Sequence, residues 1–531
     1  MKKFVEAHPI LCTLFLALVT LLPAMASRDF TPSNELRYIS LVDEAIEEGH
    51  TFAFTSHSEP YADKPPLYFW LMMLLRRIFG SHCMLALSML SFIPACGIVC
   101  VMDKWLQTAF PGRFSPGQRA GAAMMLFTSG MFLGLALVLR MDMLMCLWIV
   151  LALWTFWRLD HGIGRRRLLE WALPLYIFLA LFTKGPVGLL APPLIIAVYL
   201  ISERRARDIG KYLGLRTWGV IAALSAVWIG LAWAEGGSAY IQNLLFHQTV
   251  GRAVNAFHHK EPVWYYCWMI WCVLAPWCFL SVPAVAGGLR RGASGTERLL
   301  SLGCVAIFVM LSLFSSKLSV YLAPLFPLAV YLVPLVIDRL GWKRWMGRAL
   351  GFAPGVLGLA GIVAAAGWAL KPAPLEDLIR QYPFLGSPDV LAASLSLAAG
   401  GVAAFILMRR NDLKALWHRP VLATGCGLLL AVFFASLQMP RINDYLGYGG
   451  ICAEVSAEGE VYTAGVKRPE NMDVYLGREV KDLGKELPCY LPPSGTMIVP
   501  VGMLEQMQAG ECKVRGNLAA VRLETINNQQ I

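Results

Sequence analysis

The segment AGAAMMLFTSGMFLGLALV, residues 120–138, contains no charged side chain. About 20 apolar residues in a helix cross the roughly 30 Å hydrocarbon core of a membrane. Similar segments recur along the chain, for example Trp218–Trp233, and they are apolar on all sides rather than along one stripe. Of the 531 residues, 57% are hydrophobic and 15% are charged, whereas a soluble domain carries about a quarter charged residues. The sequence therefore predicts an all-α polytopic membrane protein.

About thirteen transmembrane helices are predicted. The first also resembles a signal peptide, because Ala24-Met25-Ala26 is similar to a cleavage site. Many spans follow, so we expect this helix to be retained. The predicted spans lie near residues 10–26, 82–102, 120–139, 142–157, 171–183, 186–202, 217–233, 264–286, 299–315, 318–337, 349–370, 389–408 and 420–437.

The basic residues indicate which way the chain is oriented. More than half of the 46 Lys and Arg residues lie at the N-terminus and in six alternate loops, namely 104–119, 158–167, 204–216, 290–298, 339–348 and 409–419. An excess of basic residues on alternate loops is typical of the cytoplasmic side. It is not typical of a nucleic-acid-binding surface, so we expect no nucleic-acid partner despite the net charge of +11. The pattern predicts a membrane protein whose C-terminus lies on the side opposite the cytoplasm.

Two domains are predicted from this topology. Residues 1–437 form a transmembrane domain with outward loops 27–81 and 234–263, and residues 438–531 form a small periplasmic α/β domain. The first loop contains a predicted helix, Glu35–Glu48, and Pro66–Phe79 reads as a helix lying at the membrane interface. In the C-terminal domain we expect strands at Glu460–Tyr462, Met497–Val501 and Val474–Leu476. Cys452, Cys489 and Cys512 lie there too, and no disulfide is assigned among them.

Several cations lie at the predicted outer boundary of the membrane. Lys184 and Lys317 each stand between two apolar spans, Arg140 lies in a third short turn, and Arg37 and Lys64 lie in the first loop. A single boundary lysine usually extends toward lipid headgroups. Several cations on one face are instead what a phosphate or pyrophosphate at the membrane surface requires.

Other chemistry is less strongly indicated. Asp63 in the first loop and a histidine of His258-His259 could together contribute to a divalent metal site, although two ligands far apart in sequence are a weak signal. No nucleotide-binding glycine motif, serine-hydrolase elbow or zinc-protease motif occurs. This favours an outward-facing reaction whose energy is stored in the donor.

Four patches carry a resemblance that covers essentially the whole chain. They are Asn34-Glu35-Leu36-Arg37-Tyr38 followed by YADKPPLYFW (61–70), FTKGP (182–186), HHKEPVWYY (258–266) and SSKLSVYLAPLFP (315–327). In order, spacing and predicted side, the chain resembles the membrane-embedded (GT-C type) glycosyltransferases that use lipid-phosphate sugars. Within that superfamily it is most similar to the bacterial aminoarabinose transferases of lipid A and to the protein O-mannosyltransferases.

The resemblance implies roles for particular residues. Asp63 and His259 match the family's ligands for a divalent metal ion (Zn, Mg or Mn). Arg37 and Lys64 match residues that hold the carrier phosphate, and Lys184 and Lys317 match less closely. The family places a catalytic Asp where this chain has Asn34. An amide cannot accept a proton at neutral pH, so either Glu35 or Asp29 replaces that base, or the acceptor is already ionised, as a lipid phosphate is.

The expected activity is transfer of a sugar from a polyprenyl-phosphate donor, such as undecaprenyl phosphate, to a lipid A-like acceptor on the periplasmic face by an inverting displacement. One alternative is protein O-glycosylation from the same donor. A transporter or flippase of lipid-linked sugars is the alternative of another class. Transporters usually carry functional charges near the bilayer midplane and in repeated halves, whereas the ionisable residues here lie at the outer boundary.

Overall fold

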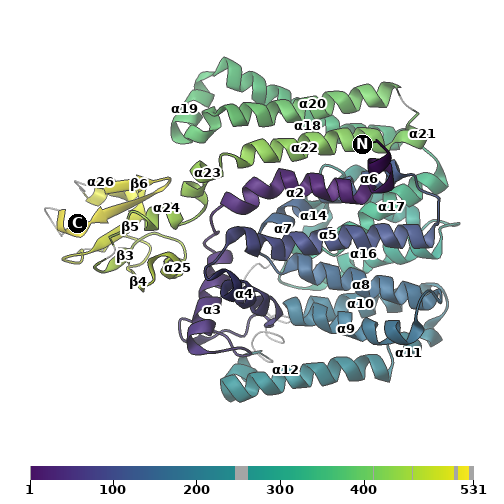
Figure 1. Ribbon diagram of the computed structural model, residues 1–531, viewed down its shortest axis with the longest axis horizontal. Helices are drawn as coiled ribbons and strands as arrows, with labels where there is room; N and C mark the ends of the chain where they lie inside the picture. The colour runs from purple at the N-terminus through teal and green to yellow at the C-terminus, as the bar shows by residue number, and fades with distance from the viewer. Residues whose placement is uncertain are drawn as a thin grey trace.

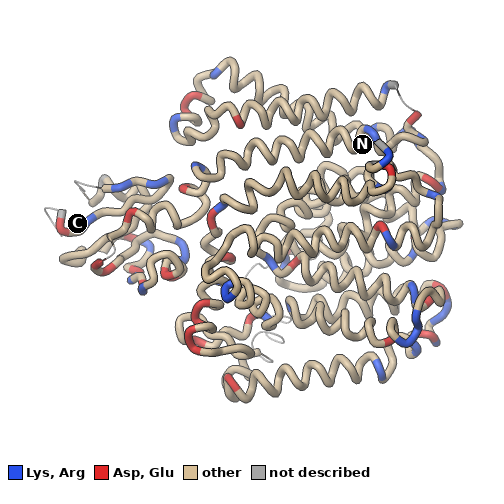
Figure 2. Tube along the Cα trace, in the orientation of Figure 1, with Lys and Arg blue, Asp and Glu red and all other residues tan. Residues whose placement is uncertain are grey.

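The computed structural model describes residues 2–244, 261–410, 412–456, 458–488, 490–507 and 512–525. Long helices lie side by side in a bundle, and a small sheet lies beyond one end of it (Figure 1). We call this end of the bundle the sheet end and the opposite end the basic end. Lys and Arg gather at the basic end (Figure 2), and the six basic loops of the sequence connect helices there. The chain is thus a multi-pass membrane protein with the charge asymmetry that its sequence predicts.

Eight helices are each long and apolar enough to cross a membrane, among the residues that the structure describes. They are α2 (Pro9–Ser27), α5 (Met84–Ala109), α8 (Asp142–Asp160), α12 (Leu215–Gln242), α16 (Gly295–Leu313), α18 (Arg344–Leu370), α20 (Pro388–Arg410) and α22 (His418–Ser436). Two bent pairs raise the number to 10: α6 (Pro116–Phe127) with α7 (Gly130–Leu137), bent by 71°, and α14 (Tyr265–Val273) with α15 (Cys278–Gly288), bent by 119°.

Three further apolar helices complete the bundle: α9 (Arg166–Lys184), α10 (Pro186–Ser202) and α17 (Leu325–Leu340). Each of the predicted spans coincides with a helix or a bent pair. The count of thirteen crossings itself stays a prediction. Shorter helices are α1 (Lys2–Ala7), α11 (Ile209–Tyr212), α19 (Ala373–Gln381) and α21 (Leu413–Leu416).

The first loop folds into three pieces. The predicted helix is confirmed as α3 (Glu35–Glu48), and the predicted interfacial helix as α4 (Leu67–Phe79). Between them lies a hairpin of β1 (Thr55–Ser56) and β2 (Glu59–Pro60), which the sequence analysis did not predict. Aromatic side chains join these pieces to the bundle, since Trp70 of α4 packs edge-on against Phe182 of α9 at 5.2 Å.

The C-terminal residues form a small sheet domain, as expected. After α23 (Met439–Leu446) and α24 (Gly449–Cys452), five strands form a mixed sheet in the order β4-β3-β5-β7-β6. Val474–Leu476, predicted as a strand, is instead part of the helical turn α25 (Asp473–Leu476) that packs on α3, so that expectation was wrong. The remaining elements are β3 (Val461–Thr463), β4 (Val480–Asp482), β5 (Thr496–Pro500), α26 (Leu504–Met507), β6 (Cys512–Arg515) and β7 (Leu518–Arg522).

Candidate active site

A buried cluster of charges lies at the sheet end, where two interhelical turns meet. Arg140 precedes α8, Asp142 is its first residue, and Lys184 is the last residue of α9. The Lys184 ammonium is paired with one oxygen of Asp142, and Arg140 Nε lies 3.1 Å from the other. The Asp142 side chain is only 2% exposed. A carboxylate at a helix N-terminus is favoured by the helix dipole, so Asp142 is well placed to hold the two cations side by side.

The chain reverses direction sharply after Lys184. Gly185 has φ 99° and ψ −148°, a conformation that glycine adopts readily and other residues do not. The FTKGP patch therefore ends α9 at the lysine and starts α10 at Pro186. Nζ of Lys184 lies 4.9 Å from the ring centre of Tyr321, which comes from the fourth sequence patch. Two of the four patches thus meet at this lysine.

The first loop approaches the same cluster through Tyr38. This side chain is buried, and burial raises its pKa to about 12, so the phenol stays neutral. The charges that act on it most strongly are Arg140, Asp142, Arg37 and Asp63. Arg37 and Asp63 of the first loop and the Arg140–Asp142 pair therefore all lie within electrostatic range of Tyr38.

The DKPP patch is held beside α3. The Arg37 guanidinium lies 4.6 Å from the ring centre of Tyr61, a distance at which a cation interacts with an aromatic ring. Asp63 and Lys64, two and three residues further on, are half-buried and both interact with neighbouring groups. The first loop therefore brings Arg37 and Lys64 toward the end of the bundle that holds Lys184.

Glu35 is fully engaged in structural contacts. Both of its oxygens accept hydrogen bonds from Arg28, at 2.5 and 2.6 Å, and the backbone amides of Thr31 and Leu139 donate to it at 2.8 and 2.6 Å. Burial alone would raise its pKa, but these donors outweigh burial and hold the pKa of Glu35 below its ordinary value. The geometry thus favours an anchoring role, joining the first loop to the turn before α8. Its predicted role as catalytic base stays a prediction.

The other two candidate bases have different surroundings. Asp29 accepts hydrogen bonds from the hydroxyl of Tyr475 and from the backbone amide of Gly449, at 2.8 Å in the second case. A methyl group on Gly447 would collide with the same carboxylate, so the C-terminal domain is packed closely around Asp29. Asn34 is exposed at the start of α3, and its side chain makes no capping hydrogen bond there.

Lys317 is buried, and its ammonium donates hydrogen bonds to two backbone carbonyls, those of Glu261 at 2.9 Å and Phe314 at 2.5 Å. It therefore ties α16 to the chain that precedes α14. The predicted metal ligand His259 lies outside the described residues. The described ones contain no group of three or more His, Cys, Asp or Glu residues that could hold a metal ion. Of the two predicted ligands, Asp63 alone belongs to the described residues. The metal ion stays a prediction.

One positioning residue was missed by the sequence analysis. Glu235, near the outer end of α12, accepts hydrogen bonds from the backbone amides of residues 51–53 at 2.6 to 3.3 Å. Tyr240 of the same helix donates to the Tyr61 carbonyl at 3.3 Å. Helix α12 therefore forms hydrogen bonds with the chain on both sides of the hairpin that leads to Asp63. A carboxylate at the end of an apolar span was the available signal, because such groups are rarely without a role.

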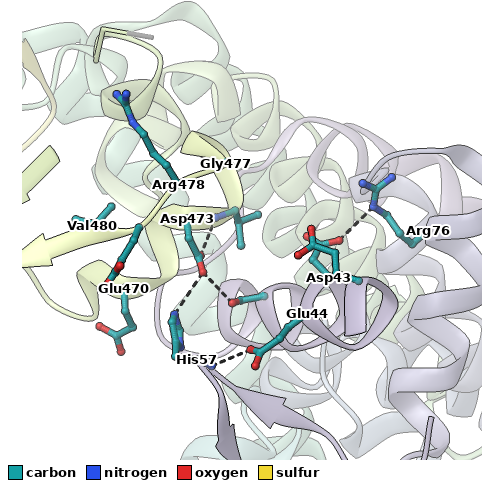
Figure 3. A pocket seen from close by; sticks show the side chains of 13 residues that line it. Asp43, Glu44, His57, Arg76, Glu470, Asp473, Gly477, Arg478 and Val480 are labelled. Carbon is teal, nitrogen blue, oxygen red and sulfur yellow. Dashed lines mark hydrogen bonds and ion pairs between the residues drawn. The ribbon is translucent and has the colours of Figure 1, made fainter. Parts of the chain in front are cut away.

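A cavity of about 450 Å³ lies between α3 and the C-terminal domain. Ser40 donates to Asp473 at 3.1 Å, and His57 lies 3.3 Å from the same oxygen (Figure 3). The lining of the cavity contains two arginines and six acidic residues, namely Asp43, Glu44, Glu47, Glu470, Asp473 and Glu479. Such a lining repels phosphate. The Arg140–Asp142–Lys184 cluster is therefore the better candidate for an anionic substrate.

Comparison with known proteins gave relatives and a shared fold, although no family model matches the chain. The chain is 26% identical to undecaprenyl phosphate-alpha-4-amino-4-deoxy-L-arabinose arabinosyl transferase 1 of Pseudomonas fluorescens over 433 residues, 80% of this chain and 72% of the relative. The transferase of that name from Pseudomonas aeruginosa is 26% identical over 386 residues, 71% of this chain and 66% of the relative.

A solved structure has the same fold. ArnT from Cupriavidus metallidurans, in a crystal structure bound to undecaprenyl phosphate, superposes with a TM-score of 0.74 at 18% identity, covering 98% of this chain and 99% of that one. The apo crystal structure of the same protein gives a TM-score of 0.73. With the sequence matches, this confirms the predicted resemblance: the chain is similar in sequence to the aminoarabinosyl transferases and has the fold of ArnT.

Proposed function

We propose that this protein is a glycosyltransferase of the inner membrane that moves a sugar from a polyprenyl-phosphate carrier to a lipid A-like acceptor on the periplasmic face. The observation that carries the proposal is the buried Arg140–Asp142–Lys184 cluster, which has a net positive charge and meets the first loop at the sheet end. The relatives reported above are named for an undecaprenyl phosphate donor. The basic end of the bundle would face the cytoplasm, and the cluster would then lie at the periplasmic surface.

Lys184 and Arg140 would bind the carrier phosphate. In an inverting displacement the acceptor oxygen bonds to the anomeric carbon, and the bond from that carbon to the phosphate oxygen breaks. Negative charge grows on the departing phosphate, and fixed cations stabilise it without rearrangement, usually a large part of the catalytic effect. Arg37 and Lys64 of the first loop would add positive charge and orient the donor.

The acceptor needs no general base if it is a phosphate. Asn34 cannot take a proton, and Glu35 and Asp29 are both engaged with other groups. A phosphate oxygen is already ionised at neutral pH, so it attacks without giving up a proton. This reasoning favours a lipid A-like acceptor over a Ser or Thr hydroxyl, which would require a base. A metal held by Asp63 and His259 remains part of the prediction, and no step is routed through it.

The test compares cells with and without this protein by mass spectrometry of their lipid A and of their periplasmic proteins. We expect the mass of one sugar to disappear from lipid A in cells lacking the protein, and to return with the wild type but not with Lys184→Met. Loss of a sugar mass from periplasmic proteins instead would establish the protein-directed alternative. No change in either pool would contradict the proposal and favour a transporter.

A further inference from the structure

A basic cavity lies at the sheet end, in residues that the proposed reaction does not use. Its volume is about 570 Å³. We call it the basic groove and define it by its three cations, Lys371, Arg380 and Arg441. Lys371 follows the last residue of α18, Arg380 belongs to α19, and Arg441 belongs to α23. The groove therefore lies between the α18–α20 connection and the helix that leads into the C-terminal domain.

The charges of the groove are unbalanced. Glu376 is the one carboxylate in its lining. Arg380 lies 3.6 Å from Asp377, but both side chains are more than three quarters exposed, and an exposed pair of this kind contributes little. Arg441 donates to the neutral Gln438 at 3.2 Å, and Lys371 lies 5.7 Å from the ring centre of Trp368. Gln438 in turn donates to Asp389, which is half-buried. The lining itself thus carries three cations and one carboxylate, with Asp377 and Asp389 beside it.

The walls of the groove are fixed by contacts between its parts. The indole of Trp368 donates to the carbonyl of Ser387 at 3.1 Å, across the α18–α20 connection. The hydroxyl of Tyr445, in α23, donates to the carbonyl of Gln381 at 3.1 Å. Tyr445 also packs on Tyr382, with ring centres 5.2 Å apart. Because α23 is tied to the connection in this way, Arg441 is held opposite the other two cations.

The groove would lie at the depth of lipid headgroups, because it is at the ends of two candidate spans. Helices α18 and α20 are both candidate membrane spans, and the groove joins their ends. Leu370 is 80% exposed and Leu378 42% exposed beside it, as expected for side chains that reach into lipid. Trp and Tyr rings are enriched at this level of a membrane. Cations that only extend toward water can lie anywhere along the membrane boundary. The three cations of the groove instead come together from the α18–α20 connection and from α23.

We infer that the basic groove binds the phosphate of an anionic phospholipid in the leaflet at the sheet end. The lipid would bridge the bundle and α23, and so fasten the C-terminal domain to the membrane surface. Cations near an anionic membrane surface attract such lipids by about 1 kcal/mol per Lys or Arg, and arginine binds phosphate through paired hydrogen bonds. The inference does not depend on the proposed glycosyltransferase activity.

Photocrosslinking tests this assignment. The full-length protein is placed in nanodiscs of phosphatidylethanolamine that contain a trace of phosphatidylglycerol with a photoreactive group beside its phosphate. Crosslinked peptides are then identified by mass spectrometry. We expect labelling of residues 371–388 and 439–446, with suppression by excess phosphatidylglycerol but not by phosphatidylethanolamine. In Lys371→Gln/Arg380→Gln/Arg441→Gln the labelling of these peptides should fall at least about tenfold.

The control is Lys467→Gln/Arg468→Gln/Lys485→Gln, which removes the same charge from exposed positions of the C-terminal domain and should leave the labelling unchanged. If the triple groove variant does not fold, Lys371→Gln and Arg380→Gln alone, both exposed, should each reduce the labelling several-fold. Equal labelling of groove variants and wild type would overturn the inference. Suppression by millimolar inorganic phosphate would also overturn it, because the groove would then be a site for free phosphate.

Discussion

Replacing Glu35 with glutamine separates an anchoring role from a catalytic one. The side chain is 2% exposed, and it is paired with an Arg28 side chain that is 8% exposed. Glutamine keeps the size of the group but removes its charge and turns one accepting oxygen into a donor. The Arg28 guanidinium would remain buried without its counter-charge, and the amide of Leu139 would lose a charged acceptor.

The expected cost follows from this burial. Removing one partner of a buried ion pair costs about 3–5 kcal/mol, because the remaining charge is left without compensation. Local opening of α3 would become easier by the same free energy, which corresponds to roughly 150- to 5,000-fold faster hydrogen exchange of its most protected backbone amides. Helix α3 carries Arg37 and Tyr38, so sugar transfer should fall as well.

Hydrogen exchange with mass spectrometry on the protein in nanodiscs measures this change directly. Glu47→Gln is the matched control, since Glu47 is exposed on the same helix, and it should leave the exchange of α3 unaltered. Our reasoning is refuted if Glu35→Gln exchanges in α3 like the wild type. If activity is nevertheless lost in that case, Glu35 acts in the chemistry, and its prediction as the catalytic base is supported.

Four further outcomes are expected. Because the pKa of Glu35 is held below its ordinary value of 4.5, its ion pair stabilises the first loop throughout the neutral range and is lost only as the pH falls below that value. The protection of α3, which is its exchange rate relative to the intrinsic rate at each pH, should fall there and stay constant between pH 6 and 8. Asn34→Ala should keep sugar transfer within about twofold in a proteoliposome assay, and a large loss would restore the need for a group at that position. Lys184→Met should lower turnover about 10²-fold or more, with partial recovery in Lys184→Arg, and unchanged turnover would exclude a role at the phosphate. Glu235→Gln weakens charge-assisted hydrogen bonds worth about 1–3 kcal/mol; the KM for the donor should rise several-fold with little change in kcat, whereas a loss of kcat alone would contradict a positioning role.

The spans were predictable because they depend on local composition. Long apolar segments and basic loops have the same meaning wherever they lie in the chain, and the helices of the bundle match them. The convergence of Lys184 with Arg140 was also within reach, since turns on the same side of a bundle lie near one another. The strand predicted at Val474–Leu476 failed because three apolar or aromatic residues fit a short helical turn equally well.

The roles of the acidic residues were not predictable in the same way. Glu35 stands one residue after the position where the family has its catalytic Asp, and sequence proximity alone made it a candidate base. Its ion pair with Arg28 depends on how the first loop folds back on the bundle. The grip of Glu235 on residues 51–53 joins segments that are far apart in the chain. Such contacts are tertiary, and no local pattern in the sequence encodes them.

The most direct test of the account is the affinity of the purified protein for undecaprenyl phosphate, measured for the wild type and for Lys184→Met. Lys485→Met, which removes an exposed cation of the C-terminal domain, serves as the control. We predict that the Lys184 variant binds at least about tenfold more weakly, a difference of about 1.4 kcal/mol or more, and that the control binds like the wild type. Equal affinity of all three proteins would contradict the claim that the Arg140–Asp142–Lys184 cluster holds the carrier phosphate.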